Sequence, residues 1–210
     1  MKYIIAIVII AALGFGAWKV VSTKAPESVP EVTVTDISTS TPASSDTIPT
    51  EISTATSSIK SATFAFTGYG PGKEHEGTFT KASYAVNKGA DGLITSGSVS
   101  FDASTVSTGI EGLDTHLKSA DFFDVAKYPS ITFTLSKIVW APTGASASVS
   151  SSTASGVLDF HGVQKAISFP ISYDEKTKTY SADLRIKASD FKLKYTAIKD
   201  EVRVMFSVAI

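Results

Sequence analysis

Cysteine is absent from the 210 residues of the chain, and that absence removes several kinds of chemistry together. Without thiols the chain forms no disulfide, no thiolate nucleophile and no zinc–thiolate site. A lipoprotein anchor, which is attached through a cysteine, is excluded as well. Neither sign of charge is in excess, since the chain has 19 Lys and Arg and 20 Asp and Glu, which gives a formal net charge of −1. No basic field is available to hold nucleic acid.

Short motifs of nucleotide and hydrolase sites are missing too. The sequence contains no phosphate loop, no Rossmann fingerprint, no His-Glu-x-x-His and no Gly-x-Ser-x-Gly. The stretch "GYGPGKEHEG" at 68–77 is rich in glycine, but it connects two predicted strands. No helix N-terminus therefore follows it that could hold a phosphate. We expect a protein without catalytic residues, resident metal or cofactor.

The first 21 residues, "MKYIIAIVIIAALGFGAWKVV", are strongly apolar. One lysine is followed by sixteen uncharged residues, Tyr3 to Trp18. A membrane span usually needs about 20 apolar residues and a signal peptide about 7–15, so the segment lies between the two. Residues 1–21 are expected to be a retained signal anchor or a cleaved signal peptide. Either alternative exports the rest of the chain, to the outer face of the cytoplasmic membrane or to the periplasm or exterior.

Residues 22–58 are rich in Ser, Thr and Pro, and their apolar residues are isolated. Such a segment buries too little surface to offset the entropy lost on ordering. We predict a disordered linker here, to which no chemistry is assigned. It would hold the following domain, residues 59–210, at some distance from a membrane.

Apolar and polar residues alternate along the rest of the chain, which is typical of strands with one buried face. Examples are "SITFTLS" (130–136), "AISFPISY" (166–173), "YSADLRI" (180–186) and "EVRVMFSVAI" (201–210). Further strands are predicted at 63–69, 77–86, 93–102 and 152–160, with turn signals between them. About eight antiparallel strands must close or pair to cover their apolar faces, and periodicity alone leaves a barrel and a sandwich open. The interval 104–129 is poor in strand signals and is expected to form a short helical cap.

Three segments, in this order, resemble the YceI-like family. They are "GSVSFDASTVSTGIEGLDTHLKSADFFDVAKYPSITF" (97–133), "GVLDFHGVQKAISFPISY" (156–173) and "ASDFKLKYTAIKDEVRVMFSV" (188–208). The resemblance implies an all-β fold, an eight-stranded antiparallel lipocalin-like barrel with a short helical cap. It also implies an elongated apolar cavity that binds polyisoprenoids or related long apolar chains.

Titratable residues are densest in "GLDTHLKSADFFDV", where Asp114, His116, Asp121 and Asp124 lie close together. A nucleophilic site would need an oriented base and a nucleophile within reach, and Ser119, three residues after His116, could contact it on a helix. No oxyanion-hole loop is visible. Asp114 and Asp121 are better interpreted as local caps that accept backbone N–H bonds.

A three-histidine metal site would require the fold to bring His75, His116 and His161 together. Their spacing does not indicate that it does. A lone histidine near a turn more often bonds a backbone carbonyl or faces solvent. An enzyme built on these histidines is the least supported hypothesis, and we predict no metal.

The apolar side chains of the strands and cap carry the main hypothesis, that the protein binds a long apolar lipid without catalysis. A polyisoprenoid, an isoprenoid quinone or a fatty acyl chain would fit, and a filled barrel serving as a stress-response or interaction module is the alternative. The N-terminal helix would contact the membrane, and a homodimer is left open. The predicted ligand-binding residues are Phe64, Phe66, Phe79, Val99, Phe101, Leu117, Phe122, Phe123, Ile131, Phe133, Phe169, Ile171, Leu184, Ile186, Val204 and Phe206.

Overall fold

The computed structural model describes residues 27–37, 59–70, 72–140, 149–193 and 199–210. Within them the protein is all-β with one short helix. The strands are β1 (Thr33–Asp36), β2 (Ser61–Gly70), β3 (Lys73–Phe79), β4 (Ala82–Lys88), β5 (Ile94–Asp102), β6 (Val106–Ser107), β7 (Ser130–Trp140), β8 (Val149–Phe160), β9 (Val163–Asp174), β10 (Thr179–Lys187) and β11 (Glu201–Ala209). The helical elements are α2 (Glu111–Lys118) and two 3-10 turns, η1 (Ala103–Thr105) and η2 (Ala188–Phe191).

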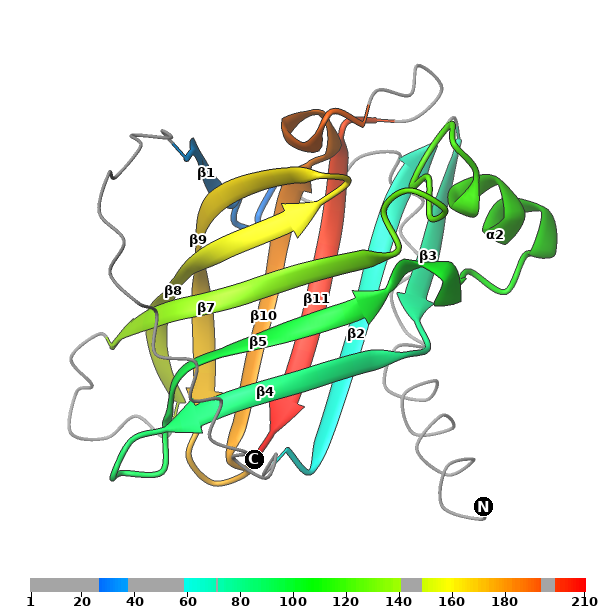
Figure 1. The fold of residues 1–210 in the computed structure, drawn as a ribbon. Coiled ribbons are helices and arrows are strands. Elements are labelled where there is room, and N and C mark those ends of the chain that lie inside the picture. The colour runs from blue at the N-terminus through cyan, green and yellow to red at the C-terminus, as the bar shows by residue number, and fades with distance from the viewer. Residues whose placement is uncertain (1–26, 38–58, 71, 141–148, 194–198) are drawn as a thin grey trace, which may run out of the picture.

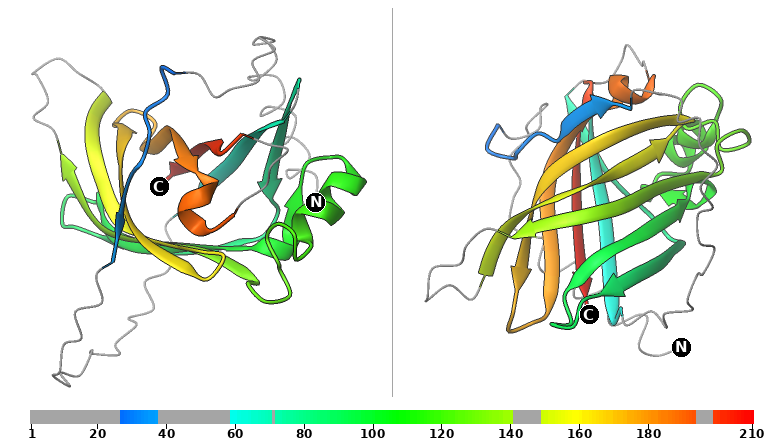
Figure 2. Two further views of the ribbon diagram at one scale, coloured as in Figure 1. Left: turned by 90° about the horizontal axis from the view of Figure 1, so that it is seen from above. Right: turned by 60° about the vertical axis from the view of Figure 1, so that its left-hand side comes forward.

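The strands form one antiparallel sheet that curls strongly around its inner face, as Figures 1 and 2 show. Along the sheet the order is β4-β5-β7-β8-β9-β10-β11-β2-β3-β6, and β1 pairs with β9 beside this path. Seen from above, the curl resembles a half-barrel, with α2 at one end of it (Figure 2). The predicted all-β antiparallel fold with a short helical cap in 104–129 is confirmed.

The register of the sheet is consistent with the predicted alternation, because every second side chain points to the inner face. Phe133 on β7 lies opposite Val99 on β5 and Leu158 on β8, so apolar residues meet apolar residues across three strands. The long hairpin β8–β9 turns at His161 and Gly162, which both have positive φ angles, 52° and 68°. Two such residues in a row are typical of the tight turns that match the twist of a hairpin.

The sheet differs from the predicted closed barrel at the predicted strand 77–86. That strand is two strands, because the N–H groups of Thr80 and Lys81 donate to Thr105, at 3.2 Å to its carbonyl and 3.1 Å to its hydroxyl. The first half, β3, pairs with β2, whereas the second half, β4, pairs with β5. β2 and β4 therefore diverge from this corner, and within the described residues no backbone pairing joins them.

β1 lies inside the segment 22–58, and there the prediction of a disordered linker is wrong for residues 27–37. Val34 of β1 lies opposite Ile167 of β9, and the N–H of Val32 donates to the carbonyl of Arg185 on β10 at 2.9 Å. β9 and β10 pair directly only near their shared turn, at Thr179–Ser181. β1 thus fills the gap where β9 and β10 separate (Figure 2).

Side chains hold β1 in this gap as well. Val32 is only 5% exposed and belongs to the main core. Lys187 pairs with Glu31 at 2.7 Å and Lys165 pairs with Asp36, and the hydrogen bond from Lys187 lowers the pKa of the Glu31 carboxyl. These ion pairs are exposed and contribute little to stability. Burial of apolar side chains, Val32 and the similarly buried Val29 among them, is therefore the larger source of docking energy.

Replacing Val32 by aspartate is expected to undock β1 and to lower the free energy of unfolding by about 1–3 kcal/mol, since a carboxylate is not buried without a partner. Thr33→Asp, at the exposed neighbouring position, is the matched control and should change the free energy of unfolding by less than about 0.5 kcal/mol. Urea unfolding measures both values. Hydrogen exchange at the Arg185 amide, which donates to the carbonyl of Pro30 at 2.8 Å, should rise in Val32→Asp alone. Equal behaviour of the two variants would contradict this account of docking.

The predicted anchor, residues 1–21, lies outside the described residues. Within the described ranges no helix is both long enough and apolar enough to cross a membrane. The remainder of the predicted linker, 22–26 and 38–58, also lies outside them.

Candidate functional site

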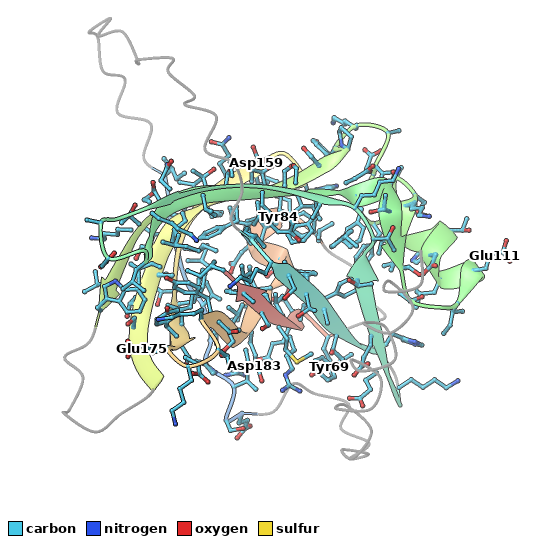
Figure 3. All side chains as sticks on the ribbon, turned by 90° about the horizontal axis from the view of Figure 1, so that it is seen from below. Tyr69, Tyr84, Glu111, Asp159, Glu175 and Asp183 are labelled. Carbon is cyan, nitrogen blue, oxygen red and sulfur yellow. The ribbon has the colours of Figure 1, made fainter. Side chains whose placement is uncertain are left out.

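The inner face of the curled sheet encloses a cavity of about 530 Å³. Side chains crowd the space between its two walls in the view from below (Figure 3). All sixteen predicted residues line it. Their contact with a ligand stays a prediction.

Further lining residues were not among the predicted set. They include Ile59, Ala62, Tyr84, Val86, Ile94, Leu135, Ile138, Ala154, Leu158, Ile167, Tyr180, Phe191, Val202 and Val208. Leu135, Ile167, Tyr180, Val202 and Val208 continue the alternation of their strands, and the same period could have identified them. Ala154 is fully buried, yet its small size and Ser-rich neighbourhood give no such signal in the sequence.

The end of the cavity beside α2 is covered by apolar side chains. Leu117 of α2 and Phe123 just after it are each 7% exposed and form a second core cluster with Val106. A row of rings continues from Phe123 to Phe79 at 6.0 Å between centroids, and from Phe79 to Phe101 at 5.5 Å. Such tilted aromatic contacts stabilise beyond the area that they bury. The predicted helical cap therefore packs on the sheet through its phenylalanines.

The acidic residues of this cap bond to its backbone rather than to a reacting group. Asp114 Oδ1 accepts hydrogen bonds from the Thr108 N–H at 2.7 Å and from the Thr108 hydroxyl at 2.6 Å. The prediction of a local cap is confirmed for Asp114. For Asp121 it is wrong within the described residues, since the N–H of Asp121 donates to Ser119 Oγ at 3.3 Å and its carboxylate accepts no hydrogen bond there.

A nucleophilic pair is not assembled at His116 and Ser119. The Ser119 hydroxyl donates to the backbone carbonyl of His116 at 2.7 Å, so its proton is directed away from the imidazole. A serine activated for attack would instead donate to the nitrogen of its base. The turn thus uses Ser119 to end α2, where the Ser119 N–H also bonds the carbonyl of His116.

The three histidines do not form a cluster. His75 and His116 line the cavity, whereas the ring of His161 lies against Tyr128 with centroids 4.6 Å apart. In the part of the chain that the structure describes, no group of three or more His, Asp or Glu side chains is placed to hold a metal ion.

Few polar side chains line the cavity, and several of those have protein partners. Thr108 bonds Asp114, and Tyr180 Oη accepts a hydrogen bond from the Ile94 N–H at 2.9 Å. Burial raises the pKa of the Tyr84 and Tyr180 phenols, so both stay protonated at neutral pH. The cavity therefore presents a mainly apolar surface with a few separate polar groups, among them the imidazoles of His75 and His116, and such a surface suits the binding of an apolar chain.

Comparison with known proteins agrees with this geometry. Residues 50–210 match the YceI-like domain. Curated relatives named Protein YceI, from Escherichia coli O157:H7 and Shigella boydii serotype 4, are 30% identical over 134 residues, or 60% of this chain. The match spans 63% of the length of those relatives, which is less than two thirds.

Two solved structures share the fold at lower identity. BcnA of Burkholderia cenocepacia is 22% identical with a TM-score of 0.59, covering 70% of this chain and 94% of BcnA. A polyisoprenoid binding domain from Saccharophagus degradans, implicated in plant cell wall breakdown, is 18% identical with a TM-score of 0.56 and coverages of 71% and 94%. The domain match extends over most of the chain and confirms the resemblance found in the sequence, so the chain belongs to the YceI-like domain family.

Proposed function

We propose that the protein binds a long apolar lipid in the cavity of its curled sheet, and carries or sequesters it outside the cytoplasm without catalysis. The observation that carries the proposal is the cavity itself, because its wall is made of apolar side chains from almost every strand. Its volume of about 530 Å³ is within the range of roughly 300–1,000 Å³ that is typical of small-molecule sites.

Three further points support the proposal. Apolar burial yields about 25 cal/mol per Å² removed from water, so an acyl or isoprenoid chain needs few polar contacts to bind tightly. A neighbour with the same fold is a polyisoprenoid binding domain. The N-terminal segment of residues 1–21 has the composition of an export signal or anchor, which would keep the domain near a membrane that supplies the lipid.

Free space in the cavity argues against the alternative of a filled barrel that serves only as an interaction or stress-response module. A side-chain-filled interior would leave no volume of this size. The proposal includes polyisoprenoids, isoprenoid quinones and fatty acyl chains.

Native mass spectrometry of the full chain, purified gently from its own host, tests the proposal. We expect a bound species of discrete mass that organic extraction removes. The stripped protein should then take up the fluorescent hydrocarbon diphenylhexatriene with a micromolar or lower dissociation constant. Repeated recovery of the unliganded mass alone, together with no uptake of the probe, would leave the module as the better explanation.

A further inference from the structure

Within the described residues no backbone pairing joins β2 and β4, and we call the place where these two strands diverge the seam. It lies between Ser61–Ala65 of β2 and Ala82–Lys88 of β4. β3 pairs with β2 only from Phe66 onward, and β4 pairs with β5 on its other side. Both strands therefore turn an unpaired edge toward the seam within the described residues.

One end of the seam is closed by aromatic rings and the other is not. At the corner the ring of Phe64 lies 4.5 Å from that of Phe101 and 5.8 Å from that of Phe79, between centroids. Farther from the corner the cavity wall is formed by Ala62 on β2 and by Tyr84 and Val86 on β4. Residues of both strands that border the seam therefore belong to the cavity wall on the side away from the aromatic rings.

Tyr84 places a hydroxyl group among these apolar residues. Its side chain lies between β4 and the opposite wall of β2 and β11 (Figure 3), and it is half-buried. In the described part of the chain its hydroxyl has no hydrogen-bond partner, in contrast to the hydroxyls of Thr108 and Tyr180. Burial raises the pKa of the Tyr84 phenol, which keeps it a hydrogen-bond donor across the neutral and mildly alkaline range.

The chain on both sides of the seam is positively charged. Residues 60–65 and 81–88 contain three lysines, Lys60, Lys81 and Lys88, and no Asp or Glu. Lys81 also lies near Asp102, so Lys60 and Lys88 are the positive charges beside the seam that attract an anion and disfavour a cation.

We propose that the seam is the entrance of the cavity, and that its ligand is a single-chain amphiphile. The anionic oxygen end of the ligand, a carboxylate or a phosphate, accepts a hydrogen bond from Tyr84 Oη, while its chain lies in the cavity. This inference rests on the proposed function and names the ligand class of the same site. It also explains why β2 and β4 stay unpaired, since pairing them would close the way in.

The Tyr84→Phe variant tests the head-group contact, because it removes the hydroxyl and keeps the ring. Parinaric acid, a fluorescent fatty acid, is expected to bind full-length Tyr84→Phe about tenfold more weakly than the unmodified protein, as a hydrogen bond to a charged acceptor is lost. Diphenylhexatriene has no oxygen and should bind both equally. Tyr128→Phe, a tyrosine outside the cavity wall, is the matched control and should change neither affinity.

Competition by hexadecanoic acid and by hexadecyl phosphate separates the two head groups. The competitor whose affinity falls more in Tyr84→Phe carries the head group that better matches the site. Unchanged affinity of Tyr84→Phe for parinaric acid and for both competitors would overturn the inference. If the unmodified protein bound neither parinaric acid nor diphenylhexatriene, the proposed function itself would fail instead.

The entrance is tested with single cysteines, which the absence of native cysteine makes specific. Thr63→Cys lies in the cavity wall at the seam, and Thr115→Cys lies on the exposed face of α2 at the covered end. A polyethylene glycol maleimide on Thr63→Cys should slow the uptake of parinaric acid at least about tenfold in stopped flow, whereas the same label on Thr115→Cys should leave the rate unchanged. The reverse pattern, or equal rates, would place the entrance elsewhere.

Discussion

Replacing Gly156 by alanine is expected to lower the free energy of unfolding by about 3 kcal/mol, at the upper end of what overpacking costs. A Cβ atom at Gly156 would lie 2.2 Å from the carbonyl oxygen of Thr134 and 2.8 Å from the ring of Phe133, whereas ordinary contacts begin at 3.4 Å. The ring can rotate, but the carbonyl belongs to the backbone of β7. Only separation of β7 and β8 would relieve the clash, and the hydrogen bonds between them oppose that separation.

The matched control is Gly68→Ala. A Cβ atom at Gly68 on β2 would meet no atom within 4 Å, and Gly68 is not in the left-handed region. The free energy of unfolding should therefore stay unchanged or rise by up to about 1 kcal/mol, because alanine restricts the unfolded chain. In thermal unfolding, Gly156→Ala should melt roughly 6–12 °C lower, at about 2–4 °C per kcal/mol for a protein of this size. Equal melting temperatures of the two variants would show that β7 and β8 yield easily at this point.

An irregularity opposite the same glycine explains why alternation did not predict Ile138 as a residue of the cavity wall. β7 carries an irregularity between Leu135 and Lys137, opposite Gly156, so its inward-facing residues change from odd to even numbers. Ile131, Phe133 and Leu135 are followed on the wall by Ile138, not by Lys137. Alternation read from the sequence assumes an unbroken period of two. A bulge breaks this period, and the sequence pattern does not show where the break falls.

Two other differences also come from tertiary structure. The segment 27–37 has no periodicity long enough to predict a strand, and it is ordered because β9 and β10 leave a gap that Val32 can fill. The break at Thr80 and Lys81 depends on hydrogen bonds to Thr105, which is 24 residues away from Lys81 along the chain. By contrast, which residues of a regular strand face inward depends only on the alternation within that strand. Every strand residue that was predicted to face the cavity lies on its wall.

The proposed role of Tyr84 could not be predicted from the sequence for a different reason. It follows the inward alternation of β4 with Val86, yet a tyrosine in a strand is most often a core or interface residue. Its importance follows from the open seam beside it, and the seam exists because the sheet does not close there. A resemblance to a family of barrels predicts the cavity but not which of its sides stays open.

Filling the cavity with a larger side chain is expected to weaken ligand binding more than about tenfold while the fold is kept. Val204 on β11 lies on the cavity wall opposite Phe66 and Leu184, near the middle of the sheet. In Val204→Phe the added ring enters space that a lipid chain would use. Displacing two buried methylene groups costs about 1.6 kcal/mol, so the affinity for diphenylhexatriene or for the extracted native lipid should fall more than about tenfold.

Val139→Phe is the matched control, because Val139 on β7 is 54% exposed and is not part of the cavity wall. The same substitution there should leave both the affinity and the melting temperature unchanged. Since the cavity offers room for the ring, Val204→Phe should lose no more than about 1–3 kcal/mol of stability. Fluorescence titration measures the affinity of the two variants for the probe, and thermal unfolding measures their stability. If Val204→Phe bound the probe as tightly as Val139→Phe, the ligand would not contact Val204, and its proposed place along the middle of the inner face would be wrong.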